Sequence, residues 1–265
     1  MQSNRSVSEQ TDLIEYILKQ IPSSLSVLYK QKLYEKGQFS FKSTLIKGDQ
    51  ALKPFAIKEN NLVYEVQLMN KLDVGVYLDA ASFRKWLLQD AHKLRVLNLF
   101  SYTCTLAVAA MKGGAQDVIN VDSSRSALEI GKNNFRLNNL PINPRSFSKI
   151  RVHDFLKFAI KKKDLYDLII IDPSPPPSSC KSTIEKFQYY QKIIIKCLPL
   201  LKPKSKLIVS SHQSIPEDDK NLHSLVLKEF PALSVIDQIP YPENYSAKTT
   251  KYYIYTYIPG TISEA

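Results

Sequence analysis

The spacing of hydrophobic and polar positions divides the chain into two parts with different expected folds. Over 13–21 apolar residues recur at helical spacing, and Pro22 predicts the end of that helix. From 26 to 68 the period falls toward two, and Asn60-Asn61 separates two strand-like runs in the manner of a hairpin. Residues 1–70 are therefore predicted to form a small, strand-rich α+β appendage.

The second part, 71–265, alternates short apolar runs with helix-like stretches. Strands are predicted at 95–100, 117–121, 166–171 and 206–210, and helices at 103–112, 124–138, 185–200 and 217–229. Such alternation is typical of an α/β domain with a parallel sheet covered by helices. The last two strand-like runs have no long helix between them, so we expect them to pair antiparallel at the sheet edge; they are 233–239 and 251–258.

The net charge of the chain indicates what kind of partner it could bind. The 36 Lys and Arg exceed the 25 Asp and Glu, which gives a net charge of +11. A strong positive balance favours a polyanion such as a nucleic acid, and the 15 tyrosines could stack on unpaired bases. The basic residues are scattered along the chain, so a soluble lysine-rich protein without such a partner stays as the alternative.

Composition also excludes several classes of protein. A hydrophobic fraction of 44% and a charged fraction of 23% are ordinary for a globular protein. No apolar run approaches the roughly 20 residues that span a bilayer, and the first residues do not form a signal peptide. Three cysteines without zinc-like spacing predict neither a disulfide framework nor a metal site, and favour a reducing cytoplasm.

Candidate ligand-binding residues follow the predicted strands, where open α/β sheets bind their ligands. Asn98 and the residues to Thr105 follow the first strand, and Asp122 ends the second, where a carboxylate can accept hydrogen bonds from both hydroxyls of a ribose. Asp154, between a short strand and a helix, could accept an adenine amino proton while Phe155 covers the ring. The alternative for each aspartate is that it caps the helix that follows.

Glycine is scarce, with 7 residues where average usage of about 7% predicts roughly 19. Cys104 stands where a tight turn would favour glycine, so no backbone nest for a pyrophosphate is expected. A cofactor with adenine and ribose but no phosphates fits these residues better.

Taken in order, several motifs resemble the class I S-adenosylmethionine-dependent methyltransferases that modify bacterial large-subunit ribosomal RNA, and within them the cytosine carbon-5 and guanine nitrogen-7 enzymes. The resemblance covers about 55–258 and rests on Gly75-Val-Tyr-Leu-Asp79, Val96-Leu-Asn-Leu-Phe-Ser-Tyr-Thr103, Gly113-Gly-Ala115, Val121-Asp-Ser-Ser124, Asn133-Asn-Phe-Arg-Leu-Asn138 and Ile171-Asp-Pro173.

The resemblance implies a Rossmann-like class I methyltransferase sheet, S-adenosyl-L-methionine as cofactor and RNA as partner. It also implies a set of site residues. The expected cofactor-binding residues are Asp79, Asn98, Phe100, Ser101, Tyr102, Thr103, Asp122, Ser123, Asp154, Phe155 and Asp172, and the expected catalytic residues are Asp172 and Pro173.

Three departures from the family pattern stand out. Cys104 replaces the usual Gly, and its side chain is expected either to crowd the approach to the methionine part of the cofactor or to require a different local backbone. Ala80 and Ala81 replace a polar residue and an Arg, which leaves Arg84. The Asp-Pro-Pro run becomes Asp172-Pro-Ser-Pro.

The cysteine positions bear on the reaction. Carbon-5 methylation of a pyrimidine needs a thiolate that adds at carbon-6. Where the carbon-5 branch carries that cysteine, this chain has Val209-Ser-Ser-His-Gln-Ser214, so only Cys180 is another plausible nucleophile; Cys197 lies in an apolar helix. A purine nitrogen needs only alignment with the methyl group, with Asp172 orienting the base.

Three functions follow as hypotheses. The first is a methyltransferase acting on RNA, and expected to act on large-subunit ribosomal RNA at a purine ring nitrogen. The second is a methyltransferase-like protein that has lost catalysis and binds RNA or serves in assembly. The third is a methyltransferase for a small molecule or a protein.

Overall fold

A computed structural model describes most of the chain; the described residues are 2–3, 8–20, 26–35, 38–49, 52–69, 74–173, 183–212, 219–240 and 250–258. The chain divides into two compact units. One comprises Met1–Lys58 with Val63–Val76, and the other comprises Glu59–Leu62 with Tyr77–Ala265. The proposed domain boundary at residue 70 stays a prediction.

The N-terminal unit is rich in strands. It contains β1 (Gln2–Ser3), a 3-10 turn (Ser8–Gln10), α1 (Thr11–Gln20), β2 (Val27–Glu35) and β3 (Gln38–Lys47), with most of β4 (Phe55–Glu59) and of β5 (Leu62–Val66). The first three strands form one sheet in the order β1-β2-β3, and β4 and β5 form a separate pair. Asn60 and Asn61 join that pair with φ of 49° and 63°, which is the left-handed geometry of a two-residue hairpin turn, as the sequence predicts.

The second unit is built on a seven-stranded sheet in the order β11-β12-β10-β9-β6-β7-β8. Neighbouring strands from β10 to β8 are parallel, whereas β12 is antiparallel to both β10 and β11. The strands are β6 (Arg95–Leu99), β7 (Asp117–Asp122), β8 (Phe147–Lys149), β9 (Tyr166–Ile171), β10 (Leu201–His212), β11 (Leu233–Ile239) and β12 (Thr250–Tyr257). The predicted α/β class, Rossmann-like and mostly parallel with an antiparallel pair at one edge, is confirmed.

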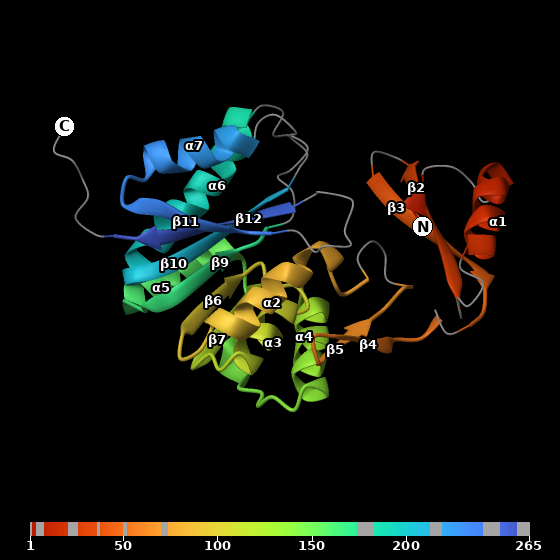
Figure 1. Ribbon diagram of the computed structural model, residues 1–265, viewed down its shortest axis with the longest axis horizontal. Helices are drawn as coiled ribbons and strands as arrows, with labels where there is room; N and C mark the ends of the chain where they lie inside the picture. The colour runs from red at the N-terminus through yellow and green to blue at the C-terminus, as the bar shows by residue number, and fades with distance from the viewer. Residues whose placement is uncertain are drawn as a thin grey trace. The chain divides into compact units, whose positions relative to one another are not determined.

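Helices cover the two faces of this sheet (Figure 1). On one face α3 packs over β6 and β7, with α4 on one side of it and α2 on the other, and α2 also contacts β11. On the other face α5, α6 and α7 pack in succession. The helices are α2 (Ala81–Asp90), α3 (Thr105–Lys112), α4 (Arg125–Leu137), α5 (Val152–Lys162), α6 (Thr183–Cys197) and α7 (Asp219–Glu229), with 3-10 turns at Leu78–Ala80, Pro144–Ser146 and Leu198–Leu200.

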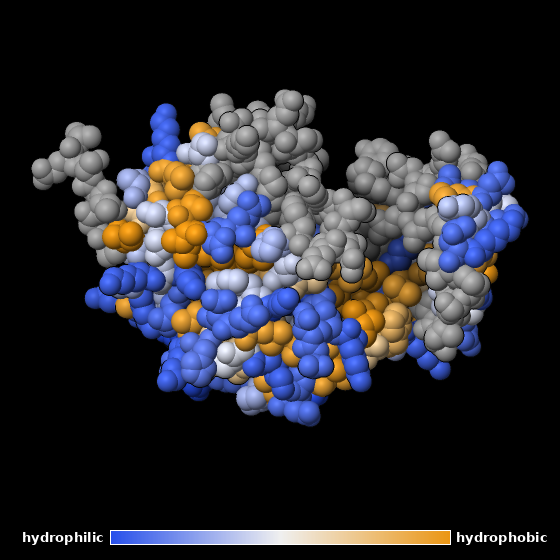
Figure 2. All heavy atoms as spheres, in the orientation of Figure 1, coloured by the Kyte–Doolittle hydropathy of each residue, from blue (hydrophilic) through white to orange (hydrophobic). Residues whose placement is uncertain are grey.

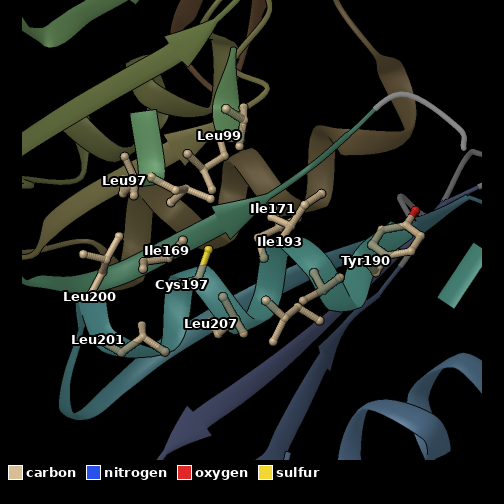
Figure 3. Packing of buried hydrophobic residues seen from close by; sticks show 14 of the residues in the cluster. Leu97, Leu99, Ile169, Ile171, Tyr190, Ile193, Cys197, Leu200, Leu201 and Leu207 are labelled. Atoms are coloured by element: carbon tan, nitrogen blue, oxygen red, sulfur yellow. The ribbon is translucent and has the colours of Figure 1, made fainter. Parts of the chain in front are cut away.

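The core on the α5–α7 face is made by alternate residues of neighbouring strands. Leu97, Leu99, Ile169, Ile171 and Leu207 point from the sheet toward α6, where Ile193 and Cys197 meet them (Figure 3). Burying this much apolar surface fixes the register of the central strands, because a shift by one residue would turn every one of these side chains to the opposite face, away from α6.

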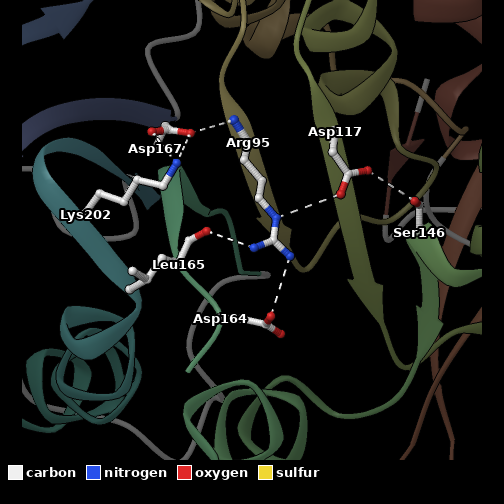
Figure 4. A network of polar contacts seen from close by, with 7 residues as sticks. All are labelled: Arg95, Asp117, Ser146, Asp164, Leu165, Asp167 and Lys202. Carbon is white, nitrogen blue, oxygen red and sulfur yellow. Dashed lines mark hydrogen bonds and ion pairs between the residues drawn. The ribbon is translucent and has the colours of Figure 1, made fainter. Parts of the chain in front are cut away.

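At the amino ends of the strands, charged side chains join β6, β7, β9 and β10 (Figure 4). The Arg95 backbone N–H donates to Asp167 Oδ2 at 2.9 Å, and Lys202 Nζ donates to the same carboxylate at 2.8 and 2.9 Å. The Arg95 guanidinium lies 3.6 Å from Asp164 and 4.0 Å from Asp117. These contacts hold the strand starts in place and leave the opposite end of the sheet for ligands.

Candidate cofactor site

The loop after β6 adopts a backbone that glycine normally provides. Phe100, Tyr102 and Cys104 have φ of 58°, 46° and 58°, so alternate residues lie in the left-handed region although each carries a side chain. Such residues cost of order 1–3 kcal/mol each and cluster at functional sites. The scarcity of glycine therefore does not remove the tight loop, because other residues take up its strained positions.

Asp122, the last residue of β7, is tied to this loop. Its Oδ2 accepts the backbone N–H of Tyr102 at 2.8 Å, and its Oδ1 accepts the backbone N–H of Ser124 at 2.7 Å. Each carboxylate oxygen has about two acceptor positions, so each keeps one for a further donor. Asp122 is partly exposed and forms no ion pair in the described part of the chain. These open positions are the acceptors that the two hydroxyls of a ribose require.

Ser124 begins α4 beside Asp122. Its hydroxyl accepts the N–H of Ala127 at 3.2 Å, which makes Ser124 the capping residue of that helix. At this end of α4, Asp122 accepts the N–H of Ser124, the residue before the helix. The conventional side-chain cap is therefore Ser124, and Asp122 has a different position and a different set of contacts. Ser123 is exposed between them.

Cys104 does not crowd the accessible edge of the sheet. Its side chain is fully buried and packs against Gly131 of α4, where an added Cβ would lie 2.5 Å from the sulfur. Its φ of 58° is a backbone angle that glycine adopts easily. The structure therefore shows neither of the two expected effects of Cys104, which were crowding at the sheet edge and a backbone unlike that of glycine. Burial raises the pKa of the Cys104 thiol to about 12, against a smaller opposing effect of its contact with Ser101.

Arg84 is the arginine that remains in the stretch Leu78–Arg84, where the sequence departs from the family pattern, and its side chain is fully buried. It forms two hydrogen bonds with the Glu59 carboxylate, at 2.6 and 2.7 Å, and a third with the carbonyl of Tyr77 at 2.9 Å. The Tyr77 ring in turn lies 5.6 Å from that of Tyr102. Arg84 thus fixes the segment that carries Tyr77 and Asp79 next to the loop after β6, a contact that the spacing of residues gave no means to predict.

The remaining predicted residues take different places. Asn98 is buried, and its Nδ2 donates to Asn120 while its Oδ1 has no hydrogen-bond partner among the described residues. Ser101 and Thr103 are buried within the loop. Asp172 and Pro173 directly follow β9, whose last residue pairs with the end of β6.

Asp154 and Phe155 lie inside the first turn of α5, because that helix begins at Val152, earlier than the sequence suggests. Asp154 is ion-paired with Arg151 at 2.9 Å and with Lys157 at 3.6 Å. Partial desolvation raises the pKa of Asp154, but the two cations outweigh it, so the pKa lies below its ordinary value. Phe155 is 7% exposed and belongs to the core of the α5–α7 face, so its ring packs there. The adenine contacts stay predictions.

Of the other cysteines and His212, the structure describes the side chain of Cys197. Cys180 lies outside the described residues, and His212 ends β10 with its side chain outside them. Cys197 is fully buried and burial raises its pKa, so it is a core residue as predicted.

Two features are absent from the part of the chain that the structure describes. Among those residues no helix is long and apolar enough to cross a bilayer. No group of His, Cys, Asp and Glu within the same residues could hold a metal ion.

Comparisons with known proteins agree with this geometry. The chain is 29% identical over 212 residues to the ribosomal RNA large subunit methyltransferase I of Aeromonas salmonicida, covering 77% of this chain and 54% of that protein. It is 31% identical over 214 residues to methyltransferase K/L of Saccharophagus degradans, covering 79% and 28%. The chain therefore spans about half or less of the length of these relatives.

A solved structure of SMU.776 in complex with S-adenosylhomocysteine has a TM-score of 0.82 and 25% identity, covering 96% of this chain and 68% of that one. The profile of a family described as S-adenosylmethionine-dependent methyltransferase matches residues 33–251. This family match covers most of the chain and agrees with the observed strand order. The chain belongs to the S-adenosylmethionine-dependent methyltransferases.

Proposed function

We propose that this protein methylates large-subunit ribosomal RNA and that its acceptor is a purine ring nitrogen. Two kinds of observation support an RNA substrate. The relatives from Aeromonas salmonicida and Saccharophagus degradans are named for methylation of that RNA. The net charge of +11 favours a polyanionic substrate.

Asp122 carries the assignment of the cofactor site. It would accept hydrogen bonds from the ribose hydroxyls through the acceptor positions that the N–H groups of Tyr102 and Ser124 leave open. The Oδ1 of Asn98, buried at the end of the adjacent strand and unpaired among the described residues, is a second acceptor at this edge. When bound, S-adenosylmethionine supplies a methyl group on a sulfonium, which is electrophilic without help from a metal.

The state of the cysteines supports nitrogen over carbon as the acceptor. Carbon-5 chemistry requires a thiolate that can reach the base, whereas Cys104 and Cys197 are fully buried and burial raises the pKa of each. A purine ring nitrogen carries its own lone pair, so the protein has only to hold the base in line with the methyl group. In this proposal Asp172 accepts a hydrogen bond from the base and Pro173 shapes the wall beside it.

The test is mass spectrometry of nucleosides from large-subunit ribosomal RNA, isolated with and without the gene. We expect one methylated purine to disappear when the gene is deleted and to return when purified protein and S-adenosylmethionine are added to that RNA. Loss of 5-methylcytidine instead would contradict the choice of acceptor. An unchanged set of methylated nucleosides would contradict the choice of substrate.

A Cys180→Ser variant sharpens the same test, because Cys180 is the one cysteine outside the described residues. The proposal predicts nearly unchanged methyl transfer, measured as radioactive methyl groups incorporated into RNA. An inactive variant that still binds S-adenosylmethionine would restore the carbon-5 mechanism.

A further inference from the structure

Three lysines and a histidine lie close together between α5 and α6, on the face of the sheet opposite α2–α4. His153 and Lys157 belong to α5, and Lys192 and Lys196 belong to α6. Lys196 Nζ lies 3.3 Å from His153 Nδ1. Burial lowers the pKa of His153, and repulsion from Lys196, then from Lys157 and Lys192, lowers it further against the attraction of Asp154. We call these four residues the α5–α6 seam.

The seam is short of acidic partners. Lys192 and Lys196 form no ion pair with a described carboxylate. They stand four residues apart on one helix, a spacing at which like charges repel. Lys157 reaches only Asp154, at 3.6 Å, and that carboxylate is already 2.9 Å from Arg151.

Some lysines elsewhere in the described chain do have such partners. Lys132 lies 2.8 Å from Glu129, and Lys206 lies 3.9 Å from Asp90. These two residues provide a matched comparison for Lys192 and Lys196, which have no ion-paired carboxylate among the described residues.

The surface beside the seam has the same character. Lys161, Lys162 and Lys163 are exposed at the end of α5, and Lys162 Nζ lies 4.4 Å from the ring centroid of Phe158, which is 51% exposed. Around the position of α5 the surface is largely hydrophilic (Figure 2). Repulsion among these lysines destabilises the free protein. Such a cluster is expected where a bound polyanion provides the negative charge that offsets the repulsion.

The seam also begins next to the candidate cofactor site. The backbone N–H of Ile150 donates to the carbonyl of Asp122 at 3.0 Å, and His153 follows three positions later in the first turn of α5. A strand of RNA whose target base lies at the carboxyl edge of the sheet can therefore continue onto α5. Phosphate contacts of this kind orient a nucleic acid without reading its sequence.

We propose that the α5–α6 seam binds the phosphate backbone of the substrate RNA outside the target nucleotide. The inference rests on the proposed function, because it takes RNA as the substrate. It assigns the seam a role in holding the RNA and no role in binding S-adenosylmethionine or in the transfer step.

The experiment compares two double variants that each remove two positive charges. Lys192→Gln/Lys196→Gln alters the seam, and Lys132→Gln/Lys206→Gln alters two ion-paired lysines elsewhere. The dissociation constant for protein-free large-subunit ribosomal RNA is measured by filter binding between about 50 and 200 mM salt. The seam variant is expected to lower the slope of log affinity against log salt by about two, because two phosphates are no longer neutralised, and the control to leave the slope unchanged.

Two further measurements make the result specific. Lys192→Arg/Lys196→Arg keeps the charge and should keep the wild-type slope. Calorimetry should give the same affinity for S-adenosylmethionine in wild type and in all three variants. Thermal melting should show that each is folded, because the Gln seam variant removes repelling charges, the Arg variant keeps them, and the control removes only two partly exposed ion pairs.

A slope in the seam variant equal to that of the charge-matched control would overturn the inference while the proposed function stands, provided that wild type binds and methylates the RNA. Wild-type protein that neither binds nor methylates ribosomal RNA would overturn the proposed function and the seam together.

Discussion

The carboxylates at the two ends of the central strands differ in their partners. At the amino end, Asp167 accepts hydrogen bonds from the backbone N–H of Arg95 and the ammonium of Lys202, and the Arg95 guanidinium lies near two further carboxylates (Figure 4). The same guanidinium lies 4.8 Å from the centroid of the Tyr166 ring. At the carboxyl end, Asp122 has two backbone N–H donors and no cation among the described residues. Asp167 thus has a cationic partner at the amino end, whereas Asp122 keeps acceptor positions open for a ligand at the carboxyl end.

Backbone conformation differs in the same direction. At the amino end, side-chain-bearing residues with positive φ occur singly, at Lys93, Lys163 and Lys204, whereas the loop after β6 holds three of them within five positions. Strain of this kind persists only where surrounding contacts hold it, here the bond from Tyr102 to Asp122 and the packing of Cys104 on Gly131. The concentration of strain at the carboxyl end is thus consistent with the proposed cofactor site there.

Replacing Asp122 should have the largest effect. In the proposed site Asp122→Ala removes the acceptor of two ribose hydroxyls. Charge-assisted hydrogen bonds contribute about 1.5–3 kcal/mol each, so affinity for S-adenosylmethionine should fall by about a hundredfold or more. Isothermal titration calorimetry measures this directly. Asp122→Asn, which keeps one acceptor oxygen, should lose less, and an Ala variant with wild-type affinity would mean that the ribose lies elsewhere.

Gly131 tests whether the strained loop depends on its packing. In Gly131→Ala the new Cβ would lie 2.5 Å from the Cys104 sulfur, and forcing extra volume into a packed site costs typically about 1–3 kcal/mol. The free energy of unfolding in urea measures that loss. Adding Cys104→Gly removes the sulfur and suits the backbone at φ 58°, so the double variant should recover most of the stability. Additive losses would show that the two residues do not interact.

Asp167 supplies the matched change at the amino end. Asp167→Ala leaves the N–H of Arg95 and the ammonium of Lys202 without their acceptor, which should lower stability by about 1–2 kcal/mol. Affinity for S-adenosylmethionine, measured with the same calorimetry, should not change. If affinity fell as far as in Asp122→Ala, the division between the two ends would be wrong.

The thiol of Cys104 has the smallest expected effect, and none near neutral pH. Its pKa is about 12 in the folded protein and near 9.0 when unburied, so below pH 9 both states keep the proton. Between pH 9 and 12 only the unfolded chain releases it, and the free energy of unfolding falls as pH rises, by up to about 1.4 kcal/mol per pH unit. Urea unfolding of wild type and Cys104→Gly at pH 8 and at pH 10 should show a shallower decline in the variant. Equal declines would mean that the native thiol is accessible.

The sequence predicts the strands of the sheet best where burial is complete. β6, β7 and β9 begin and end within one residue of their predicted limits, because each is a short and mostly apolar run. The pattern does not predict the first half of β10, since Lys202, Pro203 and Lys204 interrupt its apolar run. It does not predict helix α2 either: Ala80 at its start provides no side-chain cap, and its buried arginine looks like a surface residue in sequence.

The candidate site is predictable only in part. Placing Asp122 at the end of a strand follows from a local pattern and from the resemblance. The pairs Arg84 with Glu59 and Cys104 with Gly131 join residues far apart in sequence, and each depends on a backbone angle or a close helix contact that only the folded chain creates. Local patterns therefore predict which residues reach the carboxyl edge, and they do not predict which contacts hold those residues there.

A crystal structure of the protein with S-adenosylhomocysteine is the most direct test of the assignment of the carboxyl edge. It should show both ribose hydroxyls on the Asp122 carboxylate, with the loop from Phe100 to Cys104 unchanged and the Cys104 sulfur still against Gly131. A ligand bound away from Asp122, or a loop that moves to positions with negative φ to admit it, would contradict the assignment.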